Sequence, residues 1–132
     1  MASSTPTPAG GASTNLGLEP KIAGLLCYVP CCIGLVFSVV AAIVEKQSRF
    51  VRFHAFQSLL LHAAFIVVWI AIWVVQAALA MVGLGAVALL VHLVSWVIGL
   101  ALLALVIFMM IKANAGEEYE LPVVGPMARK WA

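Results

Sequence analysis

Residues 45–58 read EKQSRFVRFHAFQS and bring three basic residues and a histidine together in a short stretch. Long apolar runs lie on both sides of it, and neither residues 22–44 nor residues 53–111 contain any Lys, Arg, Asp or Glu. A basic cluster between two such runs is typical of a loop that joins membrane-spanning helices. The stretch therefore predicts that the chain turns here at a membrane surface.

The composition of the whole chain also indicates a membrane protein. Of its 132 residues, 65% are hydrophobic and 9% are charged, whereas roughly 25% are charged in soluble domains. Mean hydropathy is +1.17, and a soluble domain of this size would leave much apolar surface in water. The predicted partner is therefore the lipid bilayer, and the net charge of +2 gives no sign of a nucleic-acid partner.

The lengths of the apolar runs predict the number of spans. Residues 22–44 would form a helix about 35 Å long, enough to cross a hydrocarbon core of roughly 30 Å. Residues 53–111 would exceed about 85 Å as one helix, so this run must turn once. The paired glycines of MVGLG, residues 81–85, mark the break. We therefore expect an all-α integral membrane helical bundle with three transmembrane helices, at about residues 22–44, 55–79 and 86–111, the second and third forming a hairpin.

Three regions follow from these spans. Residues 1–20 begin with a stretch of Ser, Thr, Pro, Gly and Ala and are expected to be a disordered N-terminal tail. Residues 21–112 are expected to be the three-helix membrane domain. Residues 113–132 contain two glycines and two prolines that prevent a long helix, so this C-terminal tail is expected at the membrane interface.

The distribution of basic residues predicts an orientation. The link between the second and third spans carries no charge, whereas the 45–54 loop holds Lys46, Arg49 and Arg52. Because cytoplasmic loops hold the excess of Lys and Arg, the loop and the C-terminus are predicted inside and the N-terminus outside. The predicted location is the bacterial cytoplasmic (inner) membrane.

The same loop is a candidate lipid or partner site. Phenylalanines at 50, 53 and 56 would form an oblique ridge on a helix, beside arginines that can reach anionic phosphates. A role as a topology determinant explains the same pattern and stays open. The candidate residues of this site are Lys46, Arg49, Arg52, His54 and Gln57.

Small side chains form a seam along the first predicted span. Small residues let helix backbones approach closely in lipid, so the seam is expected to face another helix of this chain or of a second copy. Its members are Gly24, Cys27, Cys31, Gly34, Ser38 and Ala41. Cys27 and Cys31 with His62 or His92 would offer zinc ligands, but no Cys-x-x-Cys pair exists and no metal or cofactor is predicted. Pro30 predicts a kink in this span, either a bend or a gate.

Uncharged polar side chains inside the later spans need partners in lipid. The candidate intramembrane polar contacts are His62, Gln76, His92 and Ser95. Counting outward from the 81–85 break places His92 level with Gln76, so that pair is the expected contact. Structural hydrogen bonding and transport chemistry both remain open, although no span holds an acidic residue. No hydrolase, phosphate-loop or dinucleotide motif is present, so no enzymatic activity is predicted.

The stretch IVEKQSRFVRFHAFQSLLL, residues 43–61, resembles a motif of small prokaryotic membrane proteins of unknown function. The matching residues are Glu45, Lys46, Val51, Arg52, Phe53, His54, Ala55, Gln57 and Ser58. GLLCYVP near the start and YELPVVG in the tail resemble the same family, so the likeness covers about residues 18–127. The family is grouped with the Tic-twenty-like proteins, whose namesake is an inner-envelope component of chloroplast protein import.

The resemblance implies a helical membrane bundle but does not carry over an import activity. The namesake is described with four spans, whereas this sequence predicts three. Within the resemblance, Arg52 is expected to bind phosphates or the carboxylate of Glu45, while His54 and Gln57 are expected to tie the loop to the bundle.

Two functions are compatible with the sequence. The first is a structural, interaction or assembly component, as a homo-oligomer or within a larger membrane complex. The small-residue seam and the lack of a catalytic set favour it. The alternative is an oligomeric channel or transporter-like bundle that moves a small solute or polypeptide.

Overall fold

The computed structural model describes residues 14–30 and 32–132. They form α1 (Pro20–Leu26), α2 (Cys32–Val44), α3 (Arg49–Met81), α4 (Gly85–Asn114) and α5 (Val124–Trp131). No strand occurs within these described ranges, in agreement with the predicted all-α class. Most of the predicted disordered tail and Cys31 of the predicted seam lie outside the described residues.

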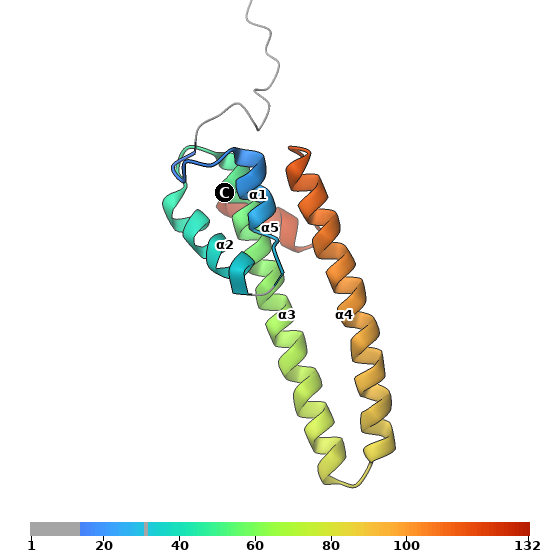
Figure 1. Ribbon diagram of the computed structural model, residues 1–132. Coiled ribbons are helices and arrows are strands. Elements are labelled where there is room, and N and C mark those ends of the chain that lie inside the picture. Colours follow the sequence, from blue (N-terminus) through green and yellow to red (C-terminus); the bar gives the residue numbers. More distant parts are fainter. Residues whose placement is uncertain (1–13, 31) are drawn as a thin grey trace, which may run out of the picture.

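The long helices α3 and α4 form an antiparallel hairpin (Figure 1). At 1.5 Å per residue they measure about 50 Å and 45 Å, and each is long and apolar enough to cross a membrane. The turn between them contains Gly83 at φ +79°, a left-handed conformation that glycine adopts without a Cβ penalty. The turn lies where the paired glycines predict it.

The first apolar run does not form a continuous helix, so the predicted single span over residues 22–44 is not confirmed. α1 ends at Leu26, and the N–H groups of Tyr28 and Val29 donate to carbonyls three residues back, at 3.0 and 3.3 Å. Pro30 has no N–H and disfavours a helical conformation at Val29, so the helix cannot continue. The kink expected at Pro30 is in fact a reversal of the chain.

After α1 and α2, the chain is back at the end of the hairpin where α1 begins. In Figure 1, α1 runs down from the end where α3 begins, and α2 runs back toward that end. Their lengths of about 10 Å and 20 Å fall short of a core of roughly 30 Å. The three-span arrangement is therefore not confirmed, because α3 and α4 are the two candidate spans in the described chain. The predicted placement of the N-terminus outside depends on this unconfirmed first span.

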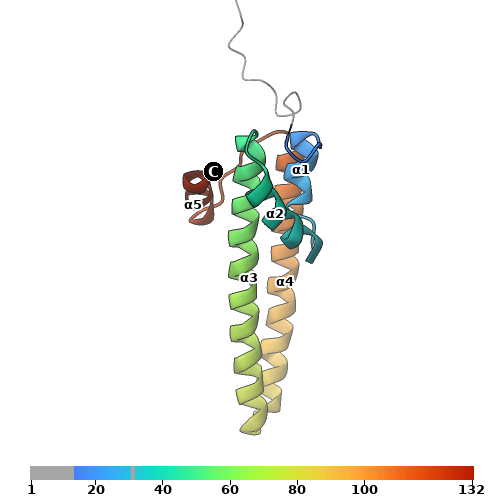
Figure 2. The same cartoon turned by 90° about the vertical axis from the view of Figure 1, so that its left-hand side faces the viewer.

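The short helices pack around one end of the hairpin. Figures 1 and 2 show α1 and α2 on one side of α3 and α5 on another, and α1 also contacts α4. The five described residues of the predicted seam, Gly24, Cys27, Gly34, Ser38 and Ala41, are all buried here. A Cβ on Gly24 would lie 3.0 Å from the Phe50 ring and 3.4 Å from Ala113. In this structure the seam thus packs against helices of its own chain.

The far part of the hairpin has an apolar surface that the rest of the described chain leaves uncovered. Trp73 is 74% exposed on α3, Met81 is 86% exposed near the turn and Val97 is 67% exposed on α4. Exposure of this kind over the length of two helices suits a lipid environment. The hairpin is therefore divided into a packed end and an apolar shaft.

Candidate functional site

Four buried polar side chains gather at the packed end, and hydrogen bonds connect three of them, Tyr28, His54 and Gln57. Tyr28 comes from the turn between α1 and α2, and His54, Gln57 and Ser58 come from the first turns of α3. All four side chains are fully buried. We call this cluster the polar hub. Leaving such a group unpaired would cost about 1–3 kcal/mol, so each requires a partner.

Hydrogen bonds join three members of the polar hub, Tyr28, His54 and Gln57, in a continuous chain. The N–H of Leu121 donates to Gln57 Oε1 at 3.0 Å. Gln57 Nε2 donates to the Tyr28 hydroxyl and to the main-chain oxygen of Tyr119, both at 2.9 Å. The Tyr28 hydroxyl lies 3.1 Å from His54 Nδ1, and His54 Nε2 lies 3.0 Å from the main-chain oxygen of Glu117.

The partners of His54 determine its tautomer. A main-chain oxygen only accepts hydrogen bonds, so His54 Nε2 must carry the hydrogen that it donates to Glu117. In the neutral ring Nδ1 then has a lone pair, which accepts the hydroxyl hydrogen of Tyr28. A second proton on the ring would leave that hydroxyl hydrogen facing another donor. The network therefore fits a neutral His54.

The hub joins three segments that are far apart in the sequence. His54 and Gln57 on α3 bind the α1–α2 turn through Tyr28 and the stretch 117–121 through its main chain. The expectation that these two side chains tie the loop to the bundle thus misses their main partner, which is the segment between α4 and α5. Sequence spacing could not reveal it, because main-chain groups carry no residue signature.

Two serines complete the turn between α1 and α2. The hydroxyls of Ser38 on α2 and Ser58 on α3 both donate to the main-chain oxygen of Cys27, and Ser38, at 3.0 Å from it, shares its single hydrogen with the main-chain oxygen of Gly34 at 2.7 Å. The last carbonyls of a helix have no partner within it, and here two side chains supply one. Because a carbonyl oxygen has two lone pairs, both serines can be accommodated.

A second polar cluster fixes the 45–48 loop. The Glu45 side chain is fully buried, and its carboxylate accepts the N–H groups of Asn15, Gln47 and Ser48 at 2.8–2.9 Å. The Asn15 side-chain oxygen accepts the N–H groups of Lys46 and Gln47 at 2.7 and 3.2 Å. The stretch before α1 and the loop before α3 are thereby held together.

Arg52 connects this loop to the C-terminal helix. Its guanidinium donates to the main-chain oxygens of Glu45 and Trp131 at 3.2 and 3.3 Å and lies 5.6 Å from the centre of the Phe56 ring. The expected bond to the Glu45 carboxylate is therefore wrong, because backbone N–H groups occupy that carboxylate. The Nε atom of Arg52 is buried without a partner in the described chain.

The predicted loop site is divided by the structure. Arg52, His54 and Gln57 have partners inside the molecule, whereas Lys46 and Arg49 are exposed. Arg129 on α5 adds ion pairs with Glu118 and Glu120 and lies 4.7 Å from the centre of the Phe53 ring. Of the predicted set, Lys46 and Arg49 are thus the two cations that face outward without an ion pair in the described chain.

The predicted intramembrane contacts are local to each helix. His92 Nε2 accepts the Trp96 indole N–H at 3.0 Å on the same helix, so the expected pair of His92 with Gln76 is wrong. Ser95 donates to the Val91 main-chain oxygen at 2.7 Å. Within the described chain Gln76 makes no hydrogen bond. The two helices of the shaft are thus not joined by polar side chains.

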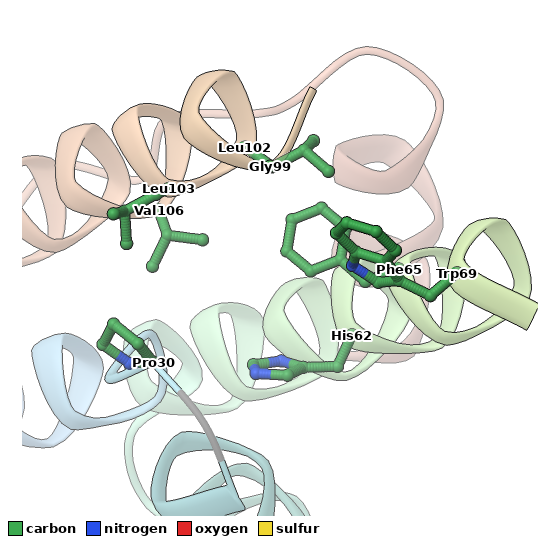
Figure 3. Close-up of a pocket in the computed structure, with 8 residues that line it drawn as sticks. All are labelled: Pro30, His62, Phe65, Trp69, Gly99, Leu102, Leu103 and Val106. Carbon is green, nitrogen blue, oxygen red and sulfur yellow. The ribbon is translucent and has the colours of Figure 1, made fainter. Parts of the chain in front are cut away.

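A cavity of about 200 Å³ lies between α3 and α4, just beyond the α1–α2 turn. Figure 3 shows His62, Phe65 and Trp69 on the α3 side and Pro30 at its end toward the packed helices. The His62 ring contacts Phe65 edge to face, with ring centres 6.4 Å apart. The described residues hold no group of three or more His, Cys, Asp or Glu side chains placed to share a metal ion, and His62 and His92 stand on different helices.

Residues 19–128, which include the entire polar hub, match the magnetosome magnetite crystal formation protein family, MamF/MmsF. The chain belongs to the MamF/MmsF family. No solved structure matches it.

Curated relatives of this MamF/MmsF protein are named as membrane proteins. A UPF0132 membrane protein of Methanocaldococcus jannaschii is 35% identical over 119 residues, 90% of this chain and 94% of the relative. A second protein of that name from the same organism is 33% identical over 117 residues, 88% of this chain and 72% of the relative. One from Archaeoglobus fulgidus is 30% identical over 113 residues, 86% of this chain and 95% of the relative.

These matches bear on the resemblance drawn from the loop motif. They support a small membrane protein family whose activity is unknown, and they do not support its grouping with the Tic-twenty-like proteins. In this MamF/MmsF protein the motif residues form a structural network. Tyr28 is a member of this network that lies outside the loop motif. A lone tyrosine within an apolar run nevertheless indicates a hydroxyl that needs a partner.

Proposed function

We propose that this MamF/MmsF protein is a structural or assembly component of a membrane, anchored by α3 and α4 and acting through its shape and surface. The observation that carries the proposal is the division of the hairpin. Its hub side chains are used in internal hydrogen bonds at the packed end, and its shaft offers apolar surface. Such a surface suits contact with lipid and with other membrane helices.

The proposal includes a two-span topology with the packed end in the cytoplasm. All seven Lys and Arg residues belong to that end, at the starts of α1 and α3, in the loop between α2 and α3, at the end of α4 and in α5. The turn at residues 82–84 carries no charge. The excess of Lys and Arg marks the cytoplasmic side, and α1–α2 then enters the cytoplasmic leaflet and returns.

Cysteine labelling tests this topology. Single cysteines replace Lys21, Gln47, Val82 and Ala132 in a variant whose natural cysteines are alanine, and an impermeant maleimide is added to intact cells. We expect labelling at position 82 alone before the cells are opened, and at the other three afterwards. Labelling of position 21 from outside would restore the three-span topology and contradict the proposal.

Reconstitution tests the role itself. In liposomes we expect cross-links between single cysteines at exposed shaft positions, such as Val97→Cys, at protein densities where Gln47→Cys gives none. Loaded dyes and ions should stay inside these liposomes. Solute release that depends on the protein would instead support the alternative, an oligomeric channel or transporter-like bundle.

The proposed role does not extend to the activity that the family description names. The family description concerns magnetite crystal formation in magnetosomes, and mineral chemistry is not part of the proposal, which rests on the helical architecture. Copurification from native membranes would identify the partners that the shaft contacts.

A further inference from the structure

The cavity beside His62 has a largely apolar wall, in which the His62 ring and the indole N–H of Trp69 are the polar side-chain groups. His62 Nδ1 lies 2.8 Å from the main-chain oxygen of Ser58 and 3.1 Å from the Ser58 hydroxyl oxygen. The hydroxyl hydrogen of Ser58 is already donated to the Cys27 main-chain oxygen. Both groups therefore accept from His62, so Nδ1 carries the hydrogen and Nε2 is an acceptor. No donor in the described chain bonds to Nε2.

The size and walls of the cavity restrict what can fill it. Its volume of about 200 Å³ compares with the engineered apolar cavity of about 150 Å³ that binds benzene. Phe65 and Trp69 line one part of it, and Pro30 and Val106 line another. One ring fits this space, and an apolar ring without a donor would leave Nε2 unpaired.

A second apolar hollow lies beside the first. Trp69, Gly99 and Leu103 line both, and the second hollow adds Trp96 and Leu100 over about 400 Å³. Trp96 and Leu100 are 63% and 62% exposed, so this hollow is open along the shaft. A chain attached to the ring can leave the first cavity through the second.

We propose that the cavity binds the hydroxylated ring of an alkyl-substituted membrane amphiphile, of the phenol or quinol class. The ring hydroxyl donates to His62 Nε2, the ring packs against Phe65 and Trp69, and the alkyl chain lies over Trp96 and Leu100. A plain acyl chain has no donor for Nε2, and a phospholipid headgroup is too polar for these walls. The site is independent of the assembly role proposed above.

A matched pair of probes tests the donor requirement. Trp73, Trp96 and Trp131 are replaced by phenylalanine, which leaves Trp69 as the single tryptophan in a lipid nanodisc. A bromine-labelled alkylphenol and its methyl ether are then compared as quenchers of Trp69 fluorescence, at equal mole fractions in the bilayer. We expect the phenol to half-quench at about tenfold lower mole fraction, the effect of one hydrogen bond in an apolar site.

Substitutions separate this site from general membrane partitioning. His62→Phe should reduce the tenfold advantage of the phenol to none, whereas the control His92→Phe should retain it. Histidine 15N spectra of the unaltered protein give a second readout, in which the Nε2 signal of His62 should shift with the phenol and not with the ether. Equal quenching by the two probes, an advantage that survives His62→Phe, or an unmoved Nε2 signal would overturn the proposal.

Discussion

Ser38 and Ser58 donate hydrogen bonds to one atom, the main-chain oxygen of Cys27. The two serines come from α2 and α3, and the shared acceptor lies just after the end of α1. Three helices therefore meet at a carbonyl that the early end of α1 would otherwise leave unpaired. The reversal at Pro30 is stable because its backbone groups find these partners.

This shared acceptor predicts non-additive mutations. Ser38→Ala or Ser58→Ala alone should lower the free energy of unfolding by about 1 kcal/mol, because the other serine still satisfies the carbonyl. The double variant should lose about 1 kcal/mol more than the sum, since the buried oxygen is then unpaired. Thermal or denaturant unfolding in detergent measures the cycle, with Ser95→Ala as the control. Additive losses would mean that the carbonyl finds another donor.

Gln57 and Gln76 offer a matched test of the polar hub. Gln57→Leu leaves the main-chain oxygen of Tyr119 and the N–H of Leu121 without partners and should destabilise the protein by about 2 kcal/mol or more. Gln76→Leu removes no hydrogen bond of the described chain and should cost little. Limited proteolysis at residues 117–121 should quicken only in the first variant. Equal protection of the two variants from the protease would show that Gln57 does not hold residues 117–121 in place.

Gly34 is required by the close approach of α2 to the α1–α2 turn. A Cβ at this position would overlap the main-chain oxygen of Val29, which cannot move aside as a side chain can. Gly34→Ala should therefore disrupt the packed end and cost several kcal/mol, of the order of other overpacking substitutions. Gly85→Ala, where a Cβ meets nothing within 4 Å, is the control. Unfolding midpoints of the two variants should differ clearly, and equal midpoints would contradict this packing.

Arg49 and Arg52 are neighbours with different surroundings. Arg52→Ala removes the bonds to Glu45 and Trp131 and should loosen α5, whereas Arg49 is exposed and its alanine variant should behave as the wild type. The measurement is the rate of trypsin cleavage after Arg129 in detergent, with an expected increase of about tenfold for a loss near 1.4 kcal/mol. Similar rates in the two variants would show that α5 does not depend on Arg52.

Val123 predicts a stabilising substitution. Its backbone lies at φ +71°, where a β-branched side chain is strained, and it is 78% exposed. Val123→Gly should therefore raise the free energy of unfolding by about 1 kcal/mol, because relief of the strain outweighs the added chain entropy. The same unfolding assay measures it, and a decrease would show that the valine side chain contributes more than the strain costs.

The sequence predicts the hairpin of α3 and α4 well because length and the glycines at 83 and 85 leave one place for a turn. It fails on the first run because the 23 uncharged residues of 22–44 have the length of a span whether or not Pro30 breaks them. A proline inside a membrane helix often produces only a kink. The reversal depends on Ser38, Ser58 and Gly34 acting together, and no single one of them signals it.

The candidate site could likewise be predicted only in part. The polarity of His54 and Gln57 at the start of α3 marks them as residues that need partners, and the loop motif draws attention to them. Their partners at Glu117, Tyr119 and Leu121 are main-chain groups more than sixty positions away. No pattern of residue types encodes such a contact, so it becomes visible only in three dimensions.

The use of residues 117–121 as hydrogen-bond partners has a consequence for the order in which the protein is made. While the ribosome is still synthesising α4, Tyr28, His54 and Gln57 have already been made, but the carbonyls and the N–H that pair with them do not yet exist. The nascent protein must therefore keep its packed end open to water or to an insertion factor. Closure of that end therefore comes after the whole of α4 has been synthesised.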